Sequence, residues 1–143
     1  MTFPVVIAAF SACLAAVSAA FAALTYRRNA NTKRAEFLLQ LHKAFFVDPT
    51  YKPIRDLLDN PNESDAEKLR KHIQEETAEL TDFLNFFELI AYFESCKTLR
   101  RHDVDALLSY YLHLIKTNGP LSSYISKDQT SFEYLNKVIE RLK

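Results

Sequence analysis

Glycine is almost absent from this sequence, because Gly119 is the single one among 143 residues. Glycine-rich phosphate loops and dinucleotide-binding turns need several positions at which backbone replaces side chain, so nucleotide folds of these kinds are excluded. Only five prolines are present, which leaves few signals for the many turns of a β-sandwich or barrel. The sequence therefore predicts an all-α protein.

Cysteine and histidine are also scarce. Cys13 and Cys96 lie far apart in unlike segments, so no disulfide is expected between them, and two isolated thiols suit a reducing compartment. The histidines show no spacing at which two metal ligands would share one helix face. They are His42, His72, His102 and His113. The sequence predicts neither a metal site nor a cofactor.

Charge is missing from the first part of the chain. All 18 Lys and Arg and all 18 Asp and Glu lie from Arg27 onward, and the zero net charge argues against nucleic-acid binding. The 22 uncharged residues 3–24 would span about 33 Å as a helix, which is enough to cross a bilayer. The segment predicts a single transmembrane helix. A cleaved signal peptide is the alternative, but no Lys or Arg precedes the segment and basic residues follow it at once.

Four basic residues close to this segment predict its orientation. Arg27, Arg28, Lys33 and Arg34 follow it, and no basic residue precedes it. The positive-inside rule then places the N-terminus outside and the rest of the chain in the cytoplasm, at the inner membrane. Near anionic lipid each such charge contributes about 1 kcal/mol, so membrane lipid is an expected partner.

Large apolar residues recur at alternating steps of four and three within the segment. They are Phe3, Ile7, Phe10, Leu14, Val17, Phe21 and Leu24. Small residues at Ala8, Ala12, Ala16 and Ala20 would let a second helix approach closely, so the pattern predicts transmembrane packing with a second copy or another protein. The alternative is an alanine-rich anchor without a partner.

The remaining chain has helical periodicity with few breaks. We expect an anchor over 1–26, a helical stalk over 27–47 that continues it, and a cytoplasmic bundle of four or five helices over 48–143. The bundle helices are expected at 49–59 after Asp48-Pro49, from Ser64 to about Ser95, from Asp103 to Asn118, and after Thr130. Ser64-x-x-Glu67 and Thr130-x-x-Glu133 have the form of capping boxes.

Asn85 and Glu88 are the strongly polar members of an otherwise apolar run, 83–93, and are expected to form a buried polar pair. A buried carboxylate can act as a general acid or base, which would suit a hydrolase or transferase. Buried charges are more often paired or capping, and Arg55 or the group Lys97, Arg100 and Arg101 could serve here. The structural role is therefore preferred. No catalytic constellation and no small-molecule substrate is identified, and we expect no enzyme.

The residues Phe83 to Ala91 read FLNFFELIA, and a helix is expected soon after them near Asp103. This stretch resembles the LNFxE-x-x-A signature of a bacterial family catalogued as domain of unknown function 4760, and the closing Phe132-Glu133 is similar to that family's final element. The resemblance implies one N-terminal transmembrane helix and a helical fold. It implies no activity, and the role of Asn85 and Glu88 in the family is unassigned.

These observations favour a membrane-tethered interaction module that binds a protein partner or forms a homo-oligomer. The alternative is a membrane effector of the stress or phage-defence type, which would act through association of its transmembrane helices.

Overall fold

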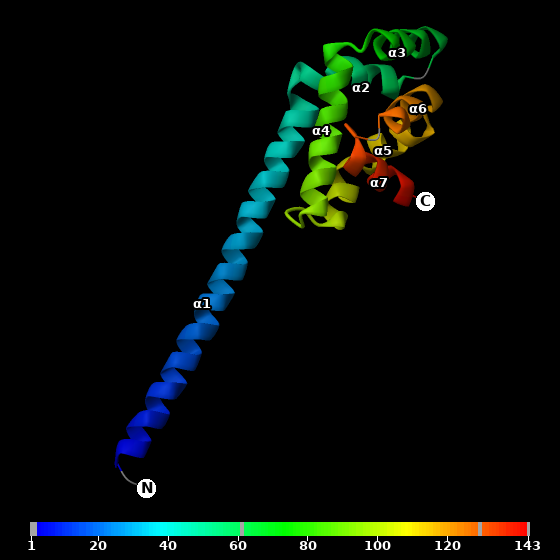
Figure 1. Cartoon of the computed structure of the whole chain (residues 1–143). Helices are drawn as coiled ribbons and strands as arrows, with labels where there is room; N and C mark the ends of the chain where they lie inside the picture. The colour runs from blue at the N-terminus through cyan, green and yellow to red at the C-terminus, as the bar shows by residue number, and fades with distance from the viewer. Residues whose placement is uncertain (1–2, 61, 129, 143) are drawn as a thin grey trace. The chain divides into compact units, whose positions relative to one another are not determined.

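The computed structural model describes residues 3–60, 62–128 and 130–142, and within these ranges the side chains from Leu14 onward. Seven α-helices, one π-helical turn and one 3₁₀ turn make up these ranges, with no strand among them, so the all-α prediction is confirmed (Figure 1). The helices are α1 Phe3–His42, α2 Lys52–Asp59, α3 Glu63–Glu75, α4 Ala78–Ser95, α5 Arg101–Thr117, α6 Gly119–Lys127 and α7 Glu133–Arg141. The π-helical turn is Lys43–Val47 and the 3₁₀ turn is Pro49–Tyr51.

The chain divides into two compact units, one ending at Gln40 and the other starting at Leu41. The first unit is a single helix, α1, without a break over its whole length (Figure 1). The second unit is the helical bundle. Its boundary lies seven residues before the predicted start at residue 48, because Leu41 and Phe45 are buried in the core of the bundle.

The predicted membrane anchor is not supported. Among the residues that the structure describes, no helix combines the length and apolar character that a membrane crossing requires. The side chains of residues 3–13, with Ala8 and Ala12, lie outside the described residues.

The prediction of a single-pass protein of the inner membrane is therefore contradicted by the described helices. The structure does not test the expected lipid contact or the membrane-effector alternative, and both stay predictions.

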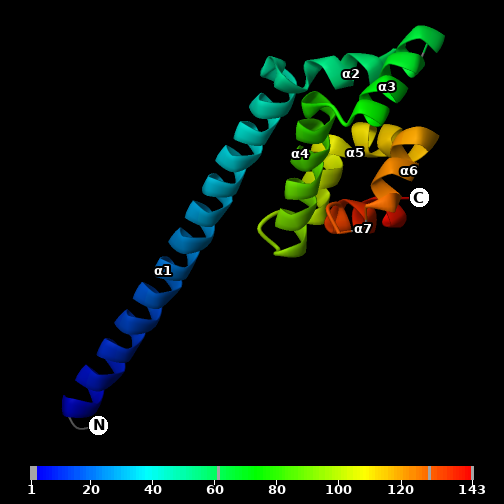
Figure 2. The ribbon, with the colours of Figure 1, turned by 45° about the horizontal axis from the view of Figure 1, so that its top comes forward.

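Helix α4 is central in the bundle and contacts α2, α3, α5 and α7 (Figure 2). Its buried face meets Phe45 of the π-helical turn, which has no exposed surface. Six aromatic rings surround Phe45, with ring centroids 4.8 to 6.0 Å away: Phe46, Tyr51, Phe83, Phe86, Phe87 and Tyr111. The Arg55 guanidinium lies 5.3 Å from the Phe45 ring centroid, within cation–π range. Four segments of the chain thus share one aromatic cluster.

The long helix expected from Ser64 to Ser95 is two helices in the structure. Glu76 adopts a left-handed conformation with φ 47° and ends α3. Thr77 then begins α4, because its hydroxyl accepts a hydrogen bond from the Leu80 backbone N–H. The apolar period continues across the junction, which is why periodicity alone did not reveal the break.

Helix caps agree with the predictions at one end and differ at others. Asp48 caps the 3₁₀ turn as expected, and hydrogen bonds from Thr50 hold its pKa below the usual value. Asn62, rather than Ser64, caps α3.

Asp103 is the third residue of α5, and its carboxylate accepts from the Arg100 backbone N–H. The Thr130 hydroxyl donates to the Asp128 side chain, and Thr130 lies before α7.

The segment Asn118-Gly119-Pro120 ends one helix and begins the next. The Asn118 side chain accepts a hydrogen bond from the Leu121 backbone N–H and so caps α6, which was not expected. Pro120 stands in the first turn, where its missing N–H costs nothing. Leu121 and Ile125 of α6 are fully buried and add to the core.

Tyr111 links the aromatic cluster to α2. Its hydroxyl donates to Asp59 at 2.9 Å, and its side chain is buried. Burial, together with the hydrogen bond to the Asp59 carboxylate and the charge of that carboxylate, raises the pKa of Tyr111 to about 12.

This raised pKa predicts a loss of stability at alkaline pH. An unfolded tyrosine ionises near pH 10, so between pH 10 and pH 12 the unfolded state has lost the proton that the folded state still holds. The Tyr111 contribution is thus complete below pH 10 and declines as the pH rises to 12. We expect the free energy of unfolding, measured with urea, to fall more steeply over this range in the native chain than in Tyr111→Phe. Equal slopes would contradict the assignment.

Candidate functional site

Glu88 is half-buried on α4 and points its carboxylate at the first turn of α7. One oxygen accepts from the Tyr134 backbone N–H at 3.1 Å and the other from the Leu135 backbone N–H at 2.7 Å. Phe132, the residue at the N-cap position of α7, offers no side-chain cap. Glu88 therefore supplies from α4 the negative charge and the acceptors that a helix N-terminus needs.

The predicted buried polar pair is not formed. Asn85 is exposed and Glu88 is half-buried, and among the described residues no polar or charged side chain is classed as buried. The periodicity of α4 turns Asn85 to the side of Asp82 and Leu89, both exposed, while Glu88 turns towards α7. The suggested partners are also elsewhere: Arg55 lies over Phe45 and donates to the Phe46 carbonyl.

A second group of charges joins α4, α5 and α7. The Arg141 guanidinium makes a bidentate pair with the Glu94 carboxylate, whose side chain is 12 % exposed, and lies 3.7 Å from Asp105. With Glu88 this pair fastens both ends of α7 to α4. The carboxylates of Glu88 and Glu94 thus both have partners, and among the described residues no three potential ligands cluster as a metal site would require.

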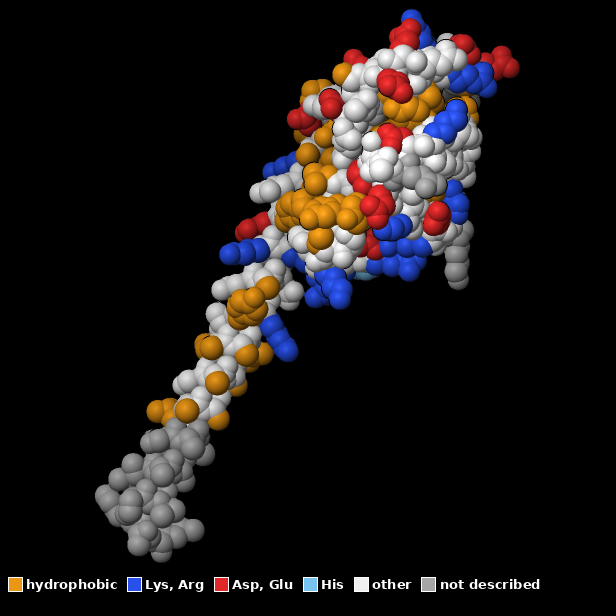
Figure 3. Space-filling view, viewed as in Figure 1, with side chains coloured by type: hydrophobic (Ala, Val, Ile, Leu, Met, Phe, Trp, Pro, Cys, Tyr) orange, Lys and Arg blue, Asp and Glu red, His pale blue; other side chains and the backbone are white. Residues whose placement is uncertain are grey.

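Helix α1 carries an exposed apolar stripe, which we define as Leu14, Val17, Phe21 and Leu24. These side chains are 60 to 72 % exposed, although each is large and apolar. Their spacing of three, four and three residues places them on one face of the helix. Figure 3 shows hydrophobic side chains along the described part of α1 and a further hydrophobic patch over the second half of α4. Leu89 and Tyr92 of α4 are 47 and 43 % exposed.

Other predicted residues of α1 lie around this stripe. Ala16 and Ala20 are exposed, as are Arg27, Arg28 and Lys33, while Arg34 is half-exposed. The structure therefore brings none of these six described residues into a closed site.

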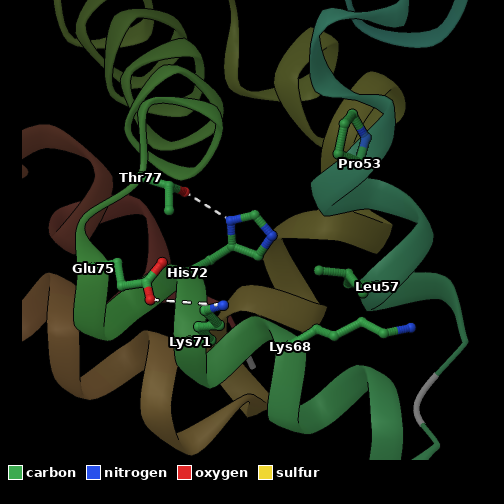
Figure 4. A pocket seen from close by; sticks show the side chains of 7 residues that line it. All are labelled: Pro53, Leu57, Lys68, Lys71, His72, Glu75 and Thr77. Atoms are coloured by element: carbon green, nitrogen blue, oxygen red, sulfur yellow. Dashed lines mark hydrogen bonds and ion pairs between the residues drawn. The ribbon is translucent and has the colours of Figure 1, made fainter.

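A hollow of about 400 Å³ lies between α2 and α3 (Figure 4). Pro53 and Leu57 of α2 form its apolar side. The polar side comes from α3 and from the junction that follows it: Lys68, Lys71, His72, Glu75 and Thr77. The break at Glu76 places Thr77 beside His72, and the His72 Nδ1 atom lies 2.7 Å from the Thr77 hydroxyl oxygen.

Comparison with known proteins adds no identification. No protein-family model, no curated protein and no solved structure matches the chain. The resemblance drawn from residues 83–91 therefore remains a prediction, and the function has to be argued from the surfaces of the molecule.

The hollow between α2 and α3 was missed by sequence reasoning. His72 has polar neighbours in the sequence and is typical of a surface residue, whereas it is half-buried in the structure. The signal that could have revealed its position is Thr77 followed by Glu79, an N-cap with an acidic residue in the first turn.

Proposed function

We propose that this chain is a non-enzymatic interaction module that associates with a second copy of itself through α1. The exposed apolar stripe of Leu14, Val17, Phe21 and Leu24 supports this proposal. An isolated helix gains nothing from such a stripe in water, whereas two helices can bury it by the knobs-into-holes packing of a coiled coil. Alanines flank the stripe and keep the approach of a second helix unobstructed.

The size of the stripe suits a reversible dimer. Completing the burial of each large side chain contributes about 1–2 kcal/mol, so eight of them in a dimer contribute about 8–16 kcal/mol. Association itself costs about 4–15 kcal/mol. The remainder is at most about 12 kcal/mol, and a dissociation constant on the order of micromolar, which corresponds to about 8 kcal/mol, lies within this range.

The charges of α1 favour an antiparallel pair. In a parallel pair, Arg27, Arg28, Lys33 and Arg34 of both copies would lie side by side and repel one another. An antiparallel pair with Leu14 against Leu24 separates the two basic groups by about 35 Å along the axis. That separation exceeds the screening length of about 8 Å at physiological salt. The arrangement also matches Val17 with Phe21 across the interface.

Sedimentation equilibrium of the full chain tests this proposal. We expect a monomer–dimer equilibrium that Phe21→Ser weakens by roughly thirtyfold to several hundredfold, because two large rings leave the interface. Tyr26→Ser is the matched control: Tyr26 is 76 % exposed on the same helix but lies off the stripe, so its loss should leave the equilibrium unchanged. A monomeric native chain, or equal effects of the two variants, would reject the proposal.

A further inference from the structure

We propose that the hollow between α2 and α3 binds a small amphipathic carboxylate, such as a short-chain organic acid. The carboxylate would lie at His72, which lines the hollow together with Lys68 and Lys71, and the apolar body of the ligand against Pro53 and Leu57 (Figure 4). This site belongs to the bundle alone and goes beyond the association through α1.

The first support for this proposal is the volume of the hollow and the presence of one apolar and one polar wall. At about 400 Å³ the hollow lies within the range of small-ligand pockets, about 300–1,000 Å³. Its walls differ in character: α2 offers two apolar side chains, and α3 offers two ammonium groups, an imidazole and the Glu75 carboxylate. A ligand with an apolar body and one anionic end matches both walls, whereas a purely apolar ligand would leave the polar wall without a partner.

The second support for this proposal comes from the hydrogen bonds at the junction of α3 and α4. The Thr77 hydroxyl oxygen accepts from the Leu80 N–H, and the hydroxyl hydrogen can then donate to His72 Nδ1, 2.7 Å away. This arrangement uses the Thr77 hydroxyl hydrogen and the Leu80 N–H and leaves the imidazole hydrogen on Nε2. In Figure 4 that second nitrogen faces the side of Pro53 and Leu57. No described residue accepts a hydrogen bond from it, so it is a donor available to a ligand.

The third support for this proposal comes from Lys68 and Lys71. Lys68 is paired with Asp65 at 2.8 Å, and Lys71 lies 3.8 Å from Glu75, outside hydrogen-bond range. The lysine side chains are 61 and 70 % exposed, and ion pairs at such positions are weak and exchange readily. An anionic ligand would compete with Asp65 for Lys68 and with Glu75 for Lys71, and these exposed pairs are the kind that exchange.

The test uses the full chain, with hexanoate as the probe and 1-hexanol as the uncharged equivalent. Binding is followed by NMR through the imidazole resonances of His72, with exposed His113 as an internal reference. We expect saturable shifts with a dissociation constant on the order of 1 mM for hexanoate, and at least roughly tenfold weaker binding of hexanol. The double variant Lys68→Gln/Lys71→Gln should weaken hexanoate binding about tenfold, and Lys137→Gln, an exposed lysine of α7, should not change it.

Each other result overturns the proposal. Equal affinity for hexanoate and hexanol would mean an apolar cavity that does not recognise a carboxylate. Unchanged affinity in the double lysine variant would show that Lys68 and Lys71 do not bind the carboxylate. An unshifted His72 at about 10 mM hexanoate would mean that the hollow does not bind this ligand class. Because these lysines are exposed, the double variant should fold, and its unfolding curve checks this.

Discussion

Replacing Phe45 with alanine should lower the free energy of unfolding by about 3–5 kcal/mol, the range measured for large-to-small changes at fully buried aromatic residues. Phe45 has no exposed surface and lies among six other rings, so its removal leaves a cavity bordered by α2, α4 and α5. The Arg55 guanidinium would also lose the ring that lies 5.3 Å from it. Urea unfolding of the full chain measures the effect.

Val47→Ala is the control for this substitution. Val47 belongs to the same π-helical turn but is 71 % exposed, so its truncation should cost less than about 0.5 kcal/mol. If Phe45→Ala cost no more than Val47→Ala, the end of α1 and the turn after it would not belong to the cooperative core. The unit boundary at Leu41 would then be wrong, and the boundary expected at residue 48 would be restored.

The all-α class followed from the scarcity of glycine and from apolar periodicity, and the order of most helices followed with it. The boundaries were less predictable, because they depend on which side chain reaches which backbone group. Glu76 and Thr77 break a continuous periodic pattern through one left-handed residue and one hydroxyl. Neither residue type requires a break, so composition and period could not reveal it.

The candidate sites were harder to predict than the fold. Asn85 and Glu88 are three residues apart, which predicts a shared face, yet the two side chains have different environments. The partners of Glu88 are the backbone N–H groups of Tyr134 and Leu135, which lie 46 and 47 residues further along the chain. No pattern in the sequence near Glu88 predicts these partners. The hollow at His72 likewise exists only because α2 packs against α3.

Replacing Glu88 should produce the second large change in the free energy of unfolding. Glu88→Ala should lower the free energy of unfolding by about 2–4 kcal/mol, because two N–H groups of α7 lose a charged acceptor. Glu88→Gln keeps one carbonyl oxygen and should cost about half as much. Urea unfolding gives the stability, and amide hydrogen exchange at Tyr134 and Leu135 should rise in both variants, more in Glu88→Ala.

Glu133→Ala separates the cap from general electrostatics. Glu133 lies exposed in the same first turn of α7 and pairs with Lys137, so its loss removes a charge near the helix N-terminus but no cap. That change should cost below about 1 kcal/mol. A Glu88→Ala effect no larger than this would show that the charge of Glu88, and not its hydrogen bonds, stabilises α7. The larger effect would identify Glu88 as the group that fixes α7 on α4, and it would give this carboxylate in an apolar run a structural role.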